Sequence, residues 1–259
     1  MWTNLGYWLP SFPLDEAETV AHRRQREYRV AASELARRVG AAAQLHRDDV
    51  VVDYACGFGD SLPLWVELFD AKRVVGVEPD PSVCELLESR IREWGLEGRV
   101  RVHNAPAELA PPRTVAPDVS AVVCVDAAYH FETRATWLQS VAESLPEGGR
   151  VAFSDLLWAS SEPPGAISRA VARQLRIEPQ NLVGEQALLA ELRDCGLEPL
   201  ASERCGNAVL DGFVRGAPRG SVAVTVTRAM LHWLRRSRRL DYTVTAAIQP
   251  IAPRSAIRG

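Results

Sequence analysis

A glycine-containing turn flanked by acidic residues is the part of the sequence best suited to bind a ligand. The apolar residues 50–52 predict a strand that ends at Asp53 and passes into Gly57-Phe58-Gly59. Because glycine has no Cβ, such a turn lets the backbone approach a ligand closely at the carboxyl end of a strand. A second acid, Glu78, ends the next predicted strand nineteen residues after Gly59. This spacing predicts a nucleoside-binding site.

The charge of the turn separates two cofactors that bind in this way. A dinucleotide would bring an anionic pyrophosphate to the turn, and the carboxylate of Asp53 would repel it. S-adenosylmethionine (SAM) brings an ammonium and a sulfonium group instead, which that carboxylate favours. The third glycine of the dinucleotide pattern is also missing, since Leu62 stands in its place. Either cofactor would place ribose hydroxyls against Glu78, so the charge at Asp53 is what favours SAM.

Polar side chains after the predicted fourth and fifth strands are the candidates for catalysis. Methyl transfer from a sulfonium depends mainly on positioning, and a base helps when the nucleophile is a hydroxyl, an ammonium or an activated carbon. His130 follows a strand at the ligand edge and titrates near neutral pH, so it is either a general base or a capping or core histidine. Tyr129 either lines the site or holds the methionine end of the cofactor, or it only packs. Asp155 is a candidate for orienting or deprotonating the acceptor.

The elements that position these residues alternate between strand and helix. Short, continuous apolar runs predict parallel strands buried on both faces, at residues 50–53, 73–78, 100–103, 119–125 and 151–154. Apolar residues at helical spacing precede or separate them, at residues 15–43, 81–94 and 133–145. This alternation predicts an α/β fold with a Rossmann-like, doubly wound sheet.

We expect four parts along the chain. Residues 1–45 form an irregular aromatic arm and a helix that act as a lid, and residues 46–157 form the SAM-binding core. Residues 158–183 are a helical cap insertion. Residues 184–259 supply the C-terminal helices and the last strands, near 197–205 and 242–248. The arm and the helical insertions are expected to cap the carboxyl edge of the sheet.

Five segments, taken together, resemble the class I SAM-dependent methyltransferases over roughly residues 49–155. Residues 51–59 (VVDYACGFG) resemble motif I, 78–80 (EPD) the acidic motif, 104–109 (NAPAEL) the adenine loop, 123–131 (VCVDAAYHF) the motif after strand four, and 145–150 (LPEGGR) the segment leading into strand five. The resemblance implies a seven-stranded sheet whose last strand inserts antiparallel between its neighbours. Ala55 departs from the usual glycine of motif I, and Asn104 or Ala105 stands where the adenine loop usually has aspartate.

The resemblance also implies roles for individual residues. The expected cofactor-binding residues are Asp53, Ala55, Cys56, Gly57, Gly59, Ser61, Glu78, Pro79, Asn104, Ala105, Val125, Asp126 and, from the arm, Tyr7. The expected substrate-binding residues are Trp8, Tyr129, His130, Trp158 and Phe213. Metal-dependent catechol-type methyltransferases have acids at the ends of strands four and five, and asparagine follows the second of these acids. Here Leu156 follows Asp155, so no metal is expected.

The arm is rich in aromatic residues, Trp2, Tyr7 and Trp8, which are costly to leave in water. A similar arm closes over the cofactor in some small-molecule methyltransferases. The alternative is an arm packed permanently on the domain or on a second subunit. Trp158 and Phe213, in the cap-like segments, either line an apolar acceptor pocket or anchor the cap.

The composition limits the partners and the compartment. Thirty basic and thirty-three acidic residues give a net charge of −3, which argues against binding nucleic acid by bulk charge. The basic residues 235–239 are expected to be the solvated end of a helix. No apolar run approaches the roughly 18–20 residues of a membrane span, and no export signal is expected. Five scattered cysteines, without a Cys-x-x-Cys pair, indicate reduced thiols in a cytoplasm.

The sequence thus predicts a cytoplasmic SAM-dependent methyltransferase, either a monomer or a homodimer, with S-adenosylhomocysteine as product. The acceptor is expected to be a small organic molecule, methylated on oxygen, nitrogen or carbon in natural-product biosynthesis. One alternative is a SAM-binding enzyme of different chemistry, such as a cyclase or isomerase. Another is a non-catalytic partner subunit with the same fold.

Overall fold

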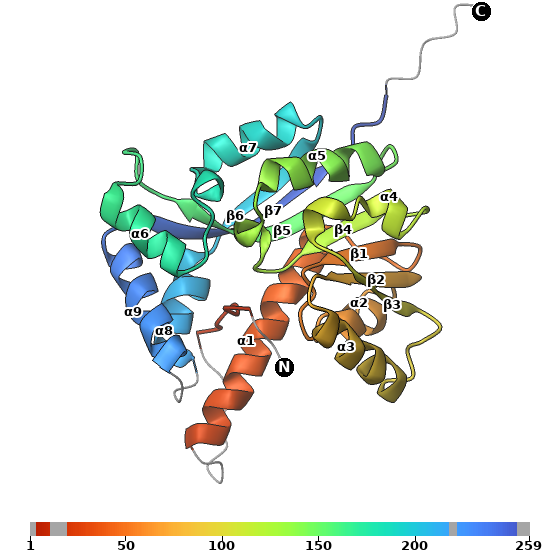
Figure 1. Ribbon diagram of the computed structural model, residues 1–259, viewed down its shortest axis with the longest axis horizontal. Coiled ribbons are helices and arrows are strands. Elements are labelled where there is room, and N and C mark those ends of the chain that lie inside the picture. Colours follow the sequence, from red (N-terminus) through yellow and green to blue (C-terminus); the bar gives the residue numbers. More distant parts are fainter. Residues whose placement is uncertain (1–3, 11–19, 218–221, 253–259) are drawn as a thin grey trace, which may run out of the picture.

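Seven strands form one mixed sheet in the computed structural model, which describes residues 4–10, 20–217 and 222–252 (Figure 1). The strands are β1 (Val50–Tyr54), β2 (Arg73–Glu78), β3 (Val100–Asn104), β4 (Ala121–Cys124), β5 (Arg150–Trp158), β6 (Glu198–Arg204) and β7 (Leu240–Ile248). Their order is β3-β2-β1-β4-β5-β7-β6. Strand β7 runs antiparallel to both of its neighbours, while β1 to β5 pair in parallel. The predicted doubly wound sheet and its inserted last strand are confirmed.

Helices cover both faces of the sheet, and a third group lies beyond its carboxyl edge. Helices α1 (Val20–Ala42), α2 (Leu62–Glu67) and α3 (Pro81–Glu93) lie on one face, and α4 (Pro112–Val115), α5 (Arg134–Ser144) and α7 (Glu185–Asp194) on the other (Figure 1). The remaining helices, α6 (Ala166–Gln174), α8 (Gly212–Gly216) and α9 (Val222–Arg236), gather beyond the edge, beside the end of α1. Of this third group, only α6 lies within residues 158–183, the segment for which a cap insertion was expected.

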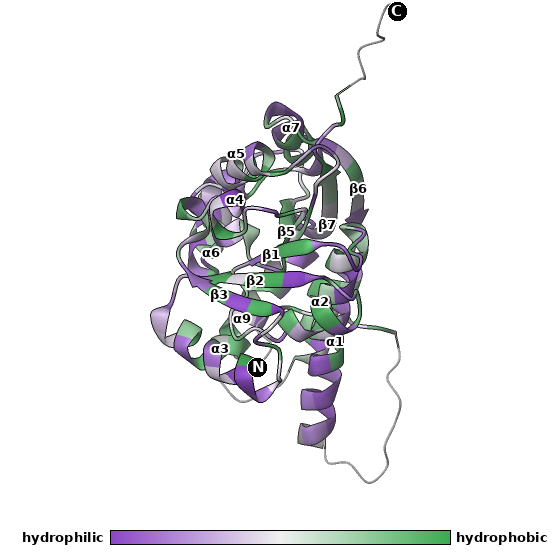
Figure 2. Ribbon diagram, turned by 90° about the vertical axis from the view of Figure 1, so that its right-hand side faces the viewer, coloured by the Kyte–Doolittle hydropathy of each residue, from purple (hydrophilic) through white to green (hydrophobic). Residues whose placement is uncertain are grey.

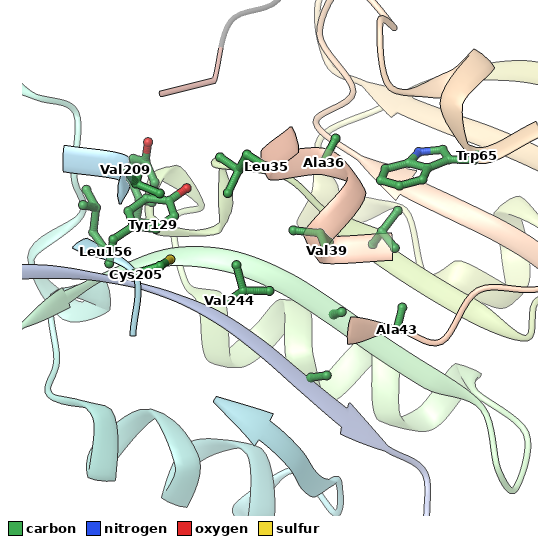
Figure 3. Close-up of a cluster of buried hydrophobic side chains, with 14 of the residues drawn as sticks. Leu35, Ala36, Val39, Ala43, Trp65, Tyr129, Leu156, Cys205, Val209 and Val244 are labelled. Atoms are coloured by element: carbon green, nitrogen blue, oxygen red, sulfur yellow. The ribbon is translucent and has the colours of Figure 1, made fainter. Parts of the chain in front are cut away.

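Each face of the sheet has its own hydrophobic cluster. Figure 3 shows part of the cluster under α1, which runs from Trp65 at one end to Tyr129 and Leu156 at the other. Trp137 of α5 is fully buried in the second cluster. The part of α1 that projects away from the sheet is mainly hydrophilic (Figure 2). The apolar stripe of α1 is therefore covered where the helix crosses the sheet.

Several boundaries differ from the predicted ones. Strand β5 continues four residues beyond the predicted end, because it pairs with β7 as far as Trp158. The predicted C-terminal helical stretch divides into α8 and α9. Strands β3 and β6 are exposed at many positions because they form the two edges of the sheet. The start of the predicted first helix, residues 15–19, and Trp2 lie outside the described residues.

Residues 4–10 contain no helix or strand and are hydrogen-bonded to the rest of the domain. The backbone N–H of Tyr7 donates to the carbonyl of Ala31 in α1 at 2.7 Å, and that of Trp8 to the carbonyl of Ala208 at 3.1 Å.

No helix among the described residues is long and apolar enough to cross a membrane. All five cysteines are free thiols, as the sequence predicted.

Candidate active site

The turn after β1 has an unusual backbone conformation. Ala55, Gly57 and Gly59 have positive φ angles of 52°, 55° and 75°. A Cβ on Gly59 would lie 2.2 Å from Leu87 of α3, and one on Gly76 of β2 would lie 2.7 Å from the sulfur of Cys56. The glycines therefore let the turn pack tightly against β2 and α3. Ala55 adopts a left-handed conformation that glycine reaches at no steric cost.

Asp53 lies beneath this turn and holds it to α2. Its side chain is buried, and one carboxylate oxygen accepts hydrogen bonds from Ser61 Oγ at 2.6 Å and Trp65 Nε1 at 2.7 Å. Burial raises the pKa of Asp53 to about 6, against the effect of these two donors. The carboxylate is thus mostly ionised at neutral pH and brings a negative charge to the turn.

Glu78 closes the turn from the end of β2. One of its carboxylate oxygens accepts the backbone N–H of Gly57 and the other that of Asp80, each at 3.1 Å. Each oxygen keeps a lone pair for a further donor, such as a ribose hydroxyl. The adjoining end of β3 is held close, because Asn104 Nδ2 and the N–H of Ala105 both donate to the Glu78 carbonyl oxygen. Glu78 is thus held in place beside the glycine turn, an arrangement that fits the ribose of SAM.

Asp126, just after β4, joins three separate parts of the chain. It has a positive φ of 59°, and one oxygen accepts the N–H of Leu5 at 2.6 Å. The other accepts the hydroxyls of Tyr129 at 2.9 Å and Tyr242 at 2.5 Å. Burial raises the pKa of Asp126 to about 6. Its carboxylate therefore anchors the arm, the segment after β4 and β7 at one point.

A cavity of about 880 Å³ opens beside Asp126. Its polar end contains Asp126, Tyr129 and His130, all from the segment after β4. Its other walls come from the arm, α1, β5, α8, α9 and the end of α6, and are mostly apolar. They consist of Leu5, Gln25, Tyr28, Leu156, Gln174, Leu175, Arg176, Ile177, Phe213, Ala217, Val222, Val224, Val226, Thr227, Met230 and Leu231. The helices beyond the sheet edge thus build most of this cavity.

His130 is held at the polar end of this cavity by the segment that follows α6. Its Nδ1 lies 2.6 Å from the carbonyl oxygen of Arg176, and its ring centroid lies 4.2 Å from that of Tyr129. The surrounding protein desolvates the ring and lowers the pKa of His130, although part of the side chain is exposed. The imidazole is therefore neutral at physiological pH, the form in which it can accept a proton.

Asp155 does not line the cavity. It is fully buried, and one carboxylate oxygen accepts a hydrogen bond from Arg134 Nη1 at 2.7 Å. Arg134 is also fully buried and pairs with Glu191 of α7 at 2.6 Å. Burial raises the pKa of Asp155 to about 6 and the Arg134 guanidinium opposes the rise, so the pair is ionised at neutral pH. This geometry gives Asp155 a structural partner away from the cavity.

The predicted aromatic residues divide between cavity and framework. Phe213 lines the cavity. Trp158 is buried and donates from Nε1 to the carbonyl of Glu162, and it is not among the lining residues. The Tyr7 ring lies 3.7 Å under the Arg38 guanidinium, on the side of α1. Trp8 packs against α8 and contributes no surface to the cavity.

Several residues of this region could not be recognised from the sequence. Tyr28 looked like one core position of a long helix, yet it lines the cavity and its hydroxyl donates to the Asn4 carbonyl at 2.8 Å. Tyr242 looked like part of a strand, yet its hydroxyl reaches Asp126. Nothing in the sequence indicated that α9 lines the cavity.

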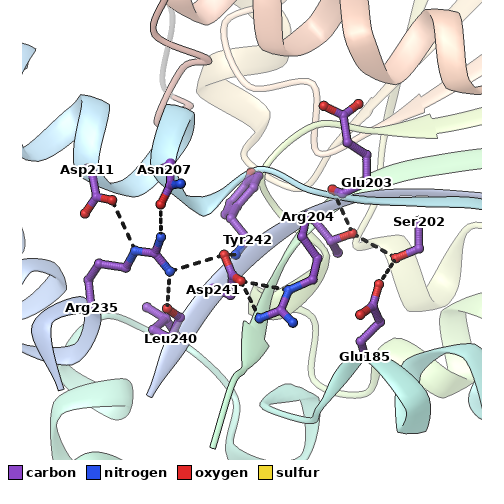
Figure 4. Close-up of polar contacts among 11 residues, drawn as sticks. Glu185, Ser202, Glu203, Arg204, Asn207, Asp211, Arg235, Leu240, Asp241 and Tyr242 are labelled. Carbon is purple, nitrogen blue, oxygen red and sulfur yellow. Dashed lines mark hydrogen bonds and ion pairs between the residues drawn. The ribbon is translucent and has the colours of Figure 1, made fainter. Parts of the chain in front are cut away.

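The basic cluster near the end of α9 is partly tied into the fold. Arg235 interacts with Asn207, Asp211 and Asp241, which also pairs with Arg204 (Figure 4). Arg235 thereby joins α9 to β7 and to the turn before α8. No group of three metal-ligating side chains is found within residues 4–10, 20–217 and 222–252.

Comparisons with known proteins agree with this architecture. Residues 51–149 match a family model described as a methyltransferase domain. Erythromycin 3''-O-methyltransferase of Saccharopolyspora erythraea is 25% identical over 246 residues, covering 90% of this chain and 75% of that protein. The 27-O-demethylrifamycin SV methyltransferase of Amycolatopsis mediterranei is 26% identical over 217 residues, covering 83% and 73%.

Among solved structures, a geranyl diphosphate methyltransferase in complex with GPP and sinefungin has a similar fold. Its TM-score is 0.82 at 18% identity, over 95% of this chain and 89% of that one. The family model and the two named relatives support a class I SAM-dependent methyltransferase, with SAM as the cofactor. The chain is a methyltransferase enzyme, as the sequence predicted.

Proposed function

We propose that this enzyme transfers the methyl group of SAM to a hydroxyl oxygen of a bulky, largely apolar small molecule. The observation that carries the proposal is the 880 Å³ cavity, which is polar at His130 and Tyr129 and mostly apolar elsewhere. A volume of this size suits a whole small molecule, since ligand pockets usually measure about 300–1,000 Å³. The body of the acceptor would lie against α9 and α6, and its hydroxyl would lie at the polar end.

The cofactor would be held by the ends of β1, β2, β3 and β4. Glu78 accepts the ribose hydroxyls, the turn from Cys56 to Gly59 lies along the amino-acid part, and the charge of Asp53 favours the cationic groups there. Asn104 or Ala105 meets the adenine. Bound SAM supplies an electrophilic methyl group on a positively charged sulfur.

His130 would act as the general base. A hydroxyl is a weak nucleophile, and removal of its proton as the new bond forms lowers the barrier. The lowered pKa of His130 keeps the ring in its unprotonated, basic form. Tyr129 lies against the His130 ring and lines the same end of the cavity, so it would limit where the acceptor hydroxyl can lie.

The named relatives support oxygen as the acceptor atom. One of them is an O-methyltransferase of erythromycin, and the other is named for a demethylrifamycin SV substrate. Both names refer to a methyl group carried on oxygen. A related acceptor would account for an apolar cavity that ends in a base.

The experiment is a titration of the purified chain with SAM, S-adenosylhomocysteine and NAD, followed by assays with hydroxylated macrolide-like and aromatic acceptors. We expect micromolar binding of the first two ligands only, and one S-adenosylhomocysteine released per O-methyl group formed. Glu78→Gln should weaken SAM binding about tenfold, as expected for the loss of a charged hydrogen bond, whereas Glu85→Gln, on an exposed turn of α3, should not.

Three results would overturn the proposal in whole or in part. Conversion of acceptors without S-adenosylhomocysteine would indicate non-methylating chemistry, such as a cyclase. Full turnover of His130→Ala would remove the general base. Methyl groups found on nitrogen or carbon would leave the methyltransferase in place but reject the hydroxyl acceptor.

A further inference from the structure

The segment that follows α6 ends in a turn that orients a single carbonyl group. The N–H of Arg176 donates to Arg173 at 2.9 Å, and that of Ile177 donates to Ala172 at 2.9 Å. These two bonds form a Schellman motif, in which the residue after the helix cap adopts a left-handed conformation. Arg176 is that residue, with a φ of 57°. Glycine is the usual residue at such a position, so an arginine there is strained.

The turn is fastened to the segment that carries His130. The N–H of Glu178 donates to the carbonyl of Tyr129 at 3.1 Å, and Asn181 Nδ2 donates to that of Phe131 at 2.6 Å. Backbone groups on both sides of His130 are thus bonded to the cap. The 2.6 Å contact between His130 Nδ1 and the Arg176 carbonyl oxygen is one of a set, and it is not an isolated encounter of a mobile side chain.

The chemistry of this contact determines which nitrogen of the His130 imidazole carries the proton. A carbonyl oxygen can only accept a hydrogen bond, so Nδ1 must be the donor and carry the proton. In the neutral ring, Nε2 is then the unprotonated nitrogen. No residue in the described part of the chain hydrogen-bonds Nε2, and the ring lines the acceptor cavity.

We infer that Arg176 is a positioning residue, whose carbonyl holds His130 as the Nδ1–H tautomer so that Nε2 accepts the proton of the acceptor hydroxyl. The inference rests on the proposed function and adds the group that prepares its base. In the reaction, the acceptor oxygen forms a bond to the methyl carbon as the carbon–sulfur bond of SAM breaks. The hydroxyl proton moves to Nε2, and the bonding electrons stay on sulfur, which leaves as neutral S-adenosylhomocysteine.

The left-handed conformation of Arg176 provides a matched pair of variants. Arg176→Gly removes the side chain and keeps the conformation, whereas Arg176→Val removes the side chain and disfavours the conformation, because β-branched residues rarely adopt positive φ. Any effect of the lost guanidinium is common to both. Arg176→Asn, which tolerates positive φ, is a third variant that should behave like the glycine variant.

The readout is ¹⁵N NMR of the histidine side chains at pH 8, with His130 assigned from the spectrum of His130→Gln. We expect a protonated Nδ1 and an unprotonated Nε2 in the wild type and in Arg176→Gly. Arg176→Val should shift the ring toward the opposite tautomer and have a kcat about tenfold below that of Arg176→Gly, with KM alike, because only the state of the base differs between them.

The outcomes separate this inference from the proposed function. A wild-type ring protonated on Nε2 would overturn the inference even in an active methyltransferase, and this measurement needs no acceptor and no variant that folds poorly. A changed tautomer in Arg176→Val with an unchanged kcat would also overturn it. Absence of O-methylation with every acceptor would instead reject the proposed function, whatever the tautomer.

Discussion

Asp126 accepts the backbone N–H of Leu5 at 2.6 Å, so the residue that follows β4 also holds the N-terminal arm. The two residues are 121 positions apart in the sequence, and both line the acceptor cavity. Leu5, in the arm, is therefore part of the cavity wall. In the structure the arm is packed on the domain.

Replacing Asp126 by asparagine should loosen this attachment. The carboxylate accepts three donors, whereas an amide offers one oxygen and turns an NH₂ group toward the others. A hydrogen bond to a charged group contributes about 1.5–3 kcal/mol, so exchange of the Leu5 amide with solvent should become about 10–100-fold faster. Native-state hydrogen exchange measures this directly.

Asp118→Asn, at an exposed ion pair with Arg73, is the control and should leave the exchange of Leu5 unchanged. An unchanged Leu5 amide in Asp126→Asn would show that other contacts of the arm hold it without the carboxylate.

A second attachment of the arm is the slot for Trp8 in α8. A Cβ on Gly216 would lie 2.2 Å from the Trp8 ring, and one on Gly212 would lie 2.5 Å from it. Gly216→Ala should therefore displace the indole and lower the free energy of unfolding by about 1–3 kcal/mol, the usual cost of overpacking. Urea unfolding measures the change, and Gly98→Ala, where nothing lies within 4 Å, is the control.

A double-mutant cycle makes this prediction specific. If the clash with Trp8 is the cause, Gly216→Ala should cost little in a Trp8→Ala background, because the offending ring is gone. An equal cost in both backgrounds would place the damage in α8 itself.

Most of the fold could be predicted because its causes are local. The continuous apolar runs of β1, β2 and β4 are buried along their whole length but for Arg73, and the glycine turn occupies the predicted place. The end of β5 could not be predicted in this way. Its last residues are held by β7, about 85 positions later, and no local pattern reports such a pairing.

In the candidate site, too, features with local causes could be predicted and features that depend on distant segments could not. Glu78 could be singled out because it stands at a fixed distance from the glycines. The partners of other candidates come from remote segments: Asp126 binds Tyr242, and Asp155 binds Arg134. A buried charge needs a partner, but the sequence does not say which residue supplies it. The cavity was the least predictable part, since its lining residues come from the arm, α1, the segment after β4, β5, the end of α6, α8 and α9.

The left-handed backbone conformation of Ala55 leads to a prediction about stability. It has a φ of 52° where motif I of related enzymes usually has glycine. The left-handed conformation costs a residue with a Cβ about 1–2 kcal/mol, and the greater freedom of an unfolded glycine offsets about 0.4–1 kcal/mol of any gain. Ala55→Gly should thus stabilise the fold by about 0.5–1 kcal/mol in urea unfolding.

Ala229→Gly, at an exposed position within α9, is the matched control and should destabilise by about 1 kcal/mol. A loss of stability in Ala55→Gly of the same size as in the control would mean that the turn is not strained at Ala55.

Asp53 makes the protein's stability depend on pH in a defined direction. Burial raises its pKa from the usual 3.8 to about 6, so the folded state binds this proton more tightly than the unfolded state. The stabilisation is then fully present below about pH 4 and is lost as the pH rises through 6, for a total of about 3 kcal/mol. In Asp53→Asn this titration is absent. The unfolding free energy of the wild type minus that of the variant should therefore fall by about this amount between pH 4 and pH 7. Asp48→Asn, at an exposed turn, is the control and should follow the wild-type curve. A wild-type curve parallel to that of Asp53→Asn would mean that the Asp53 carboxyl titrates alike in the folded and the unfolded state.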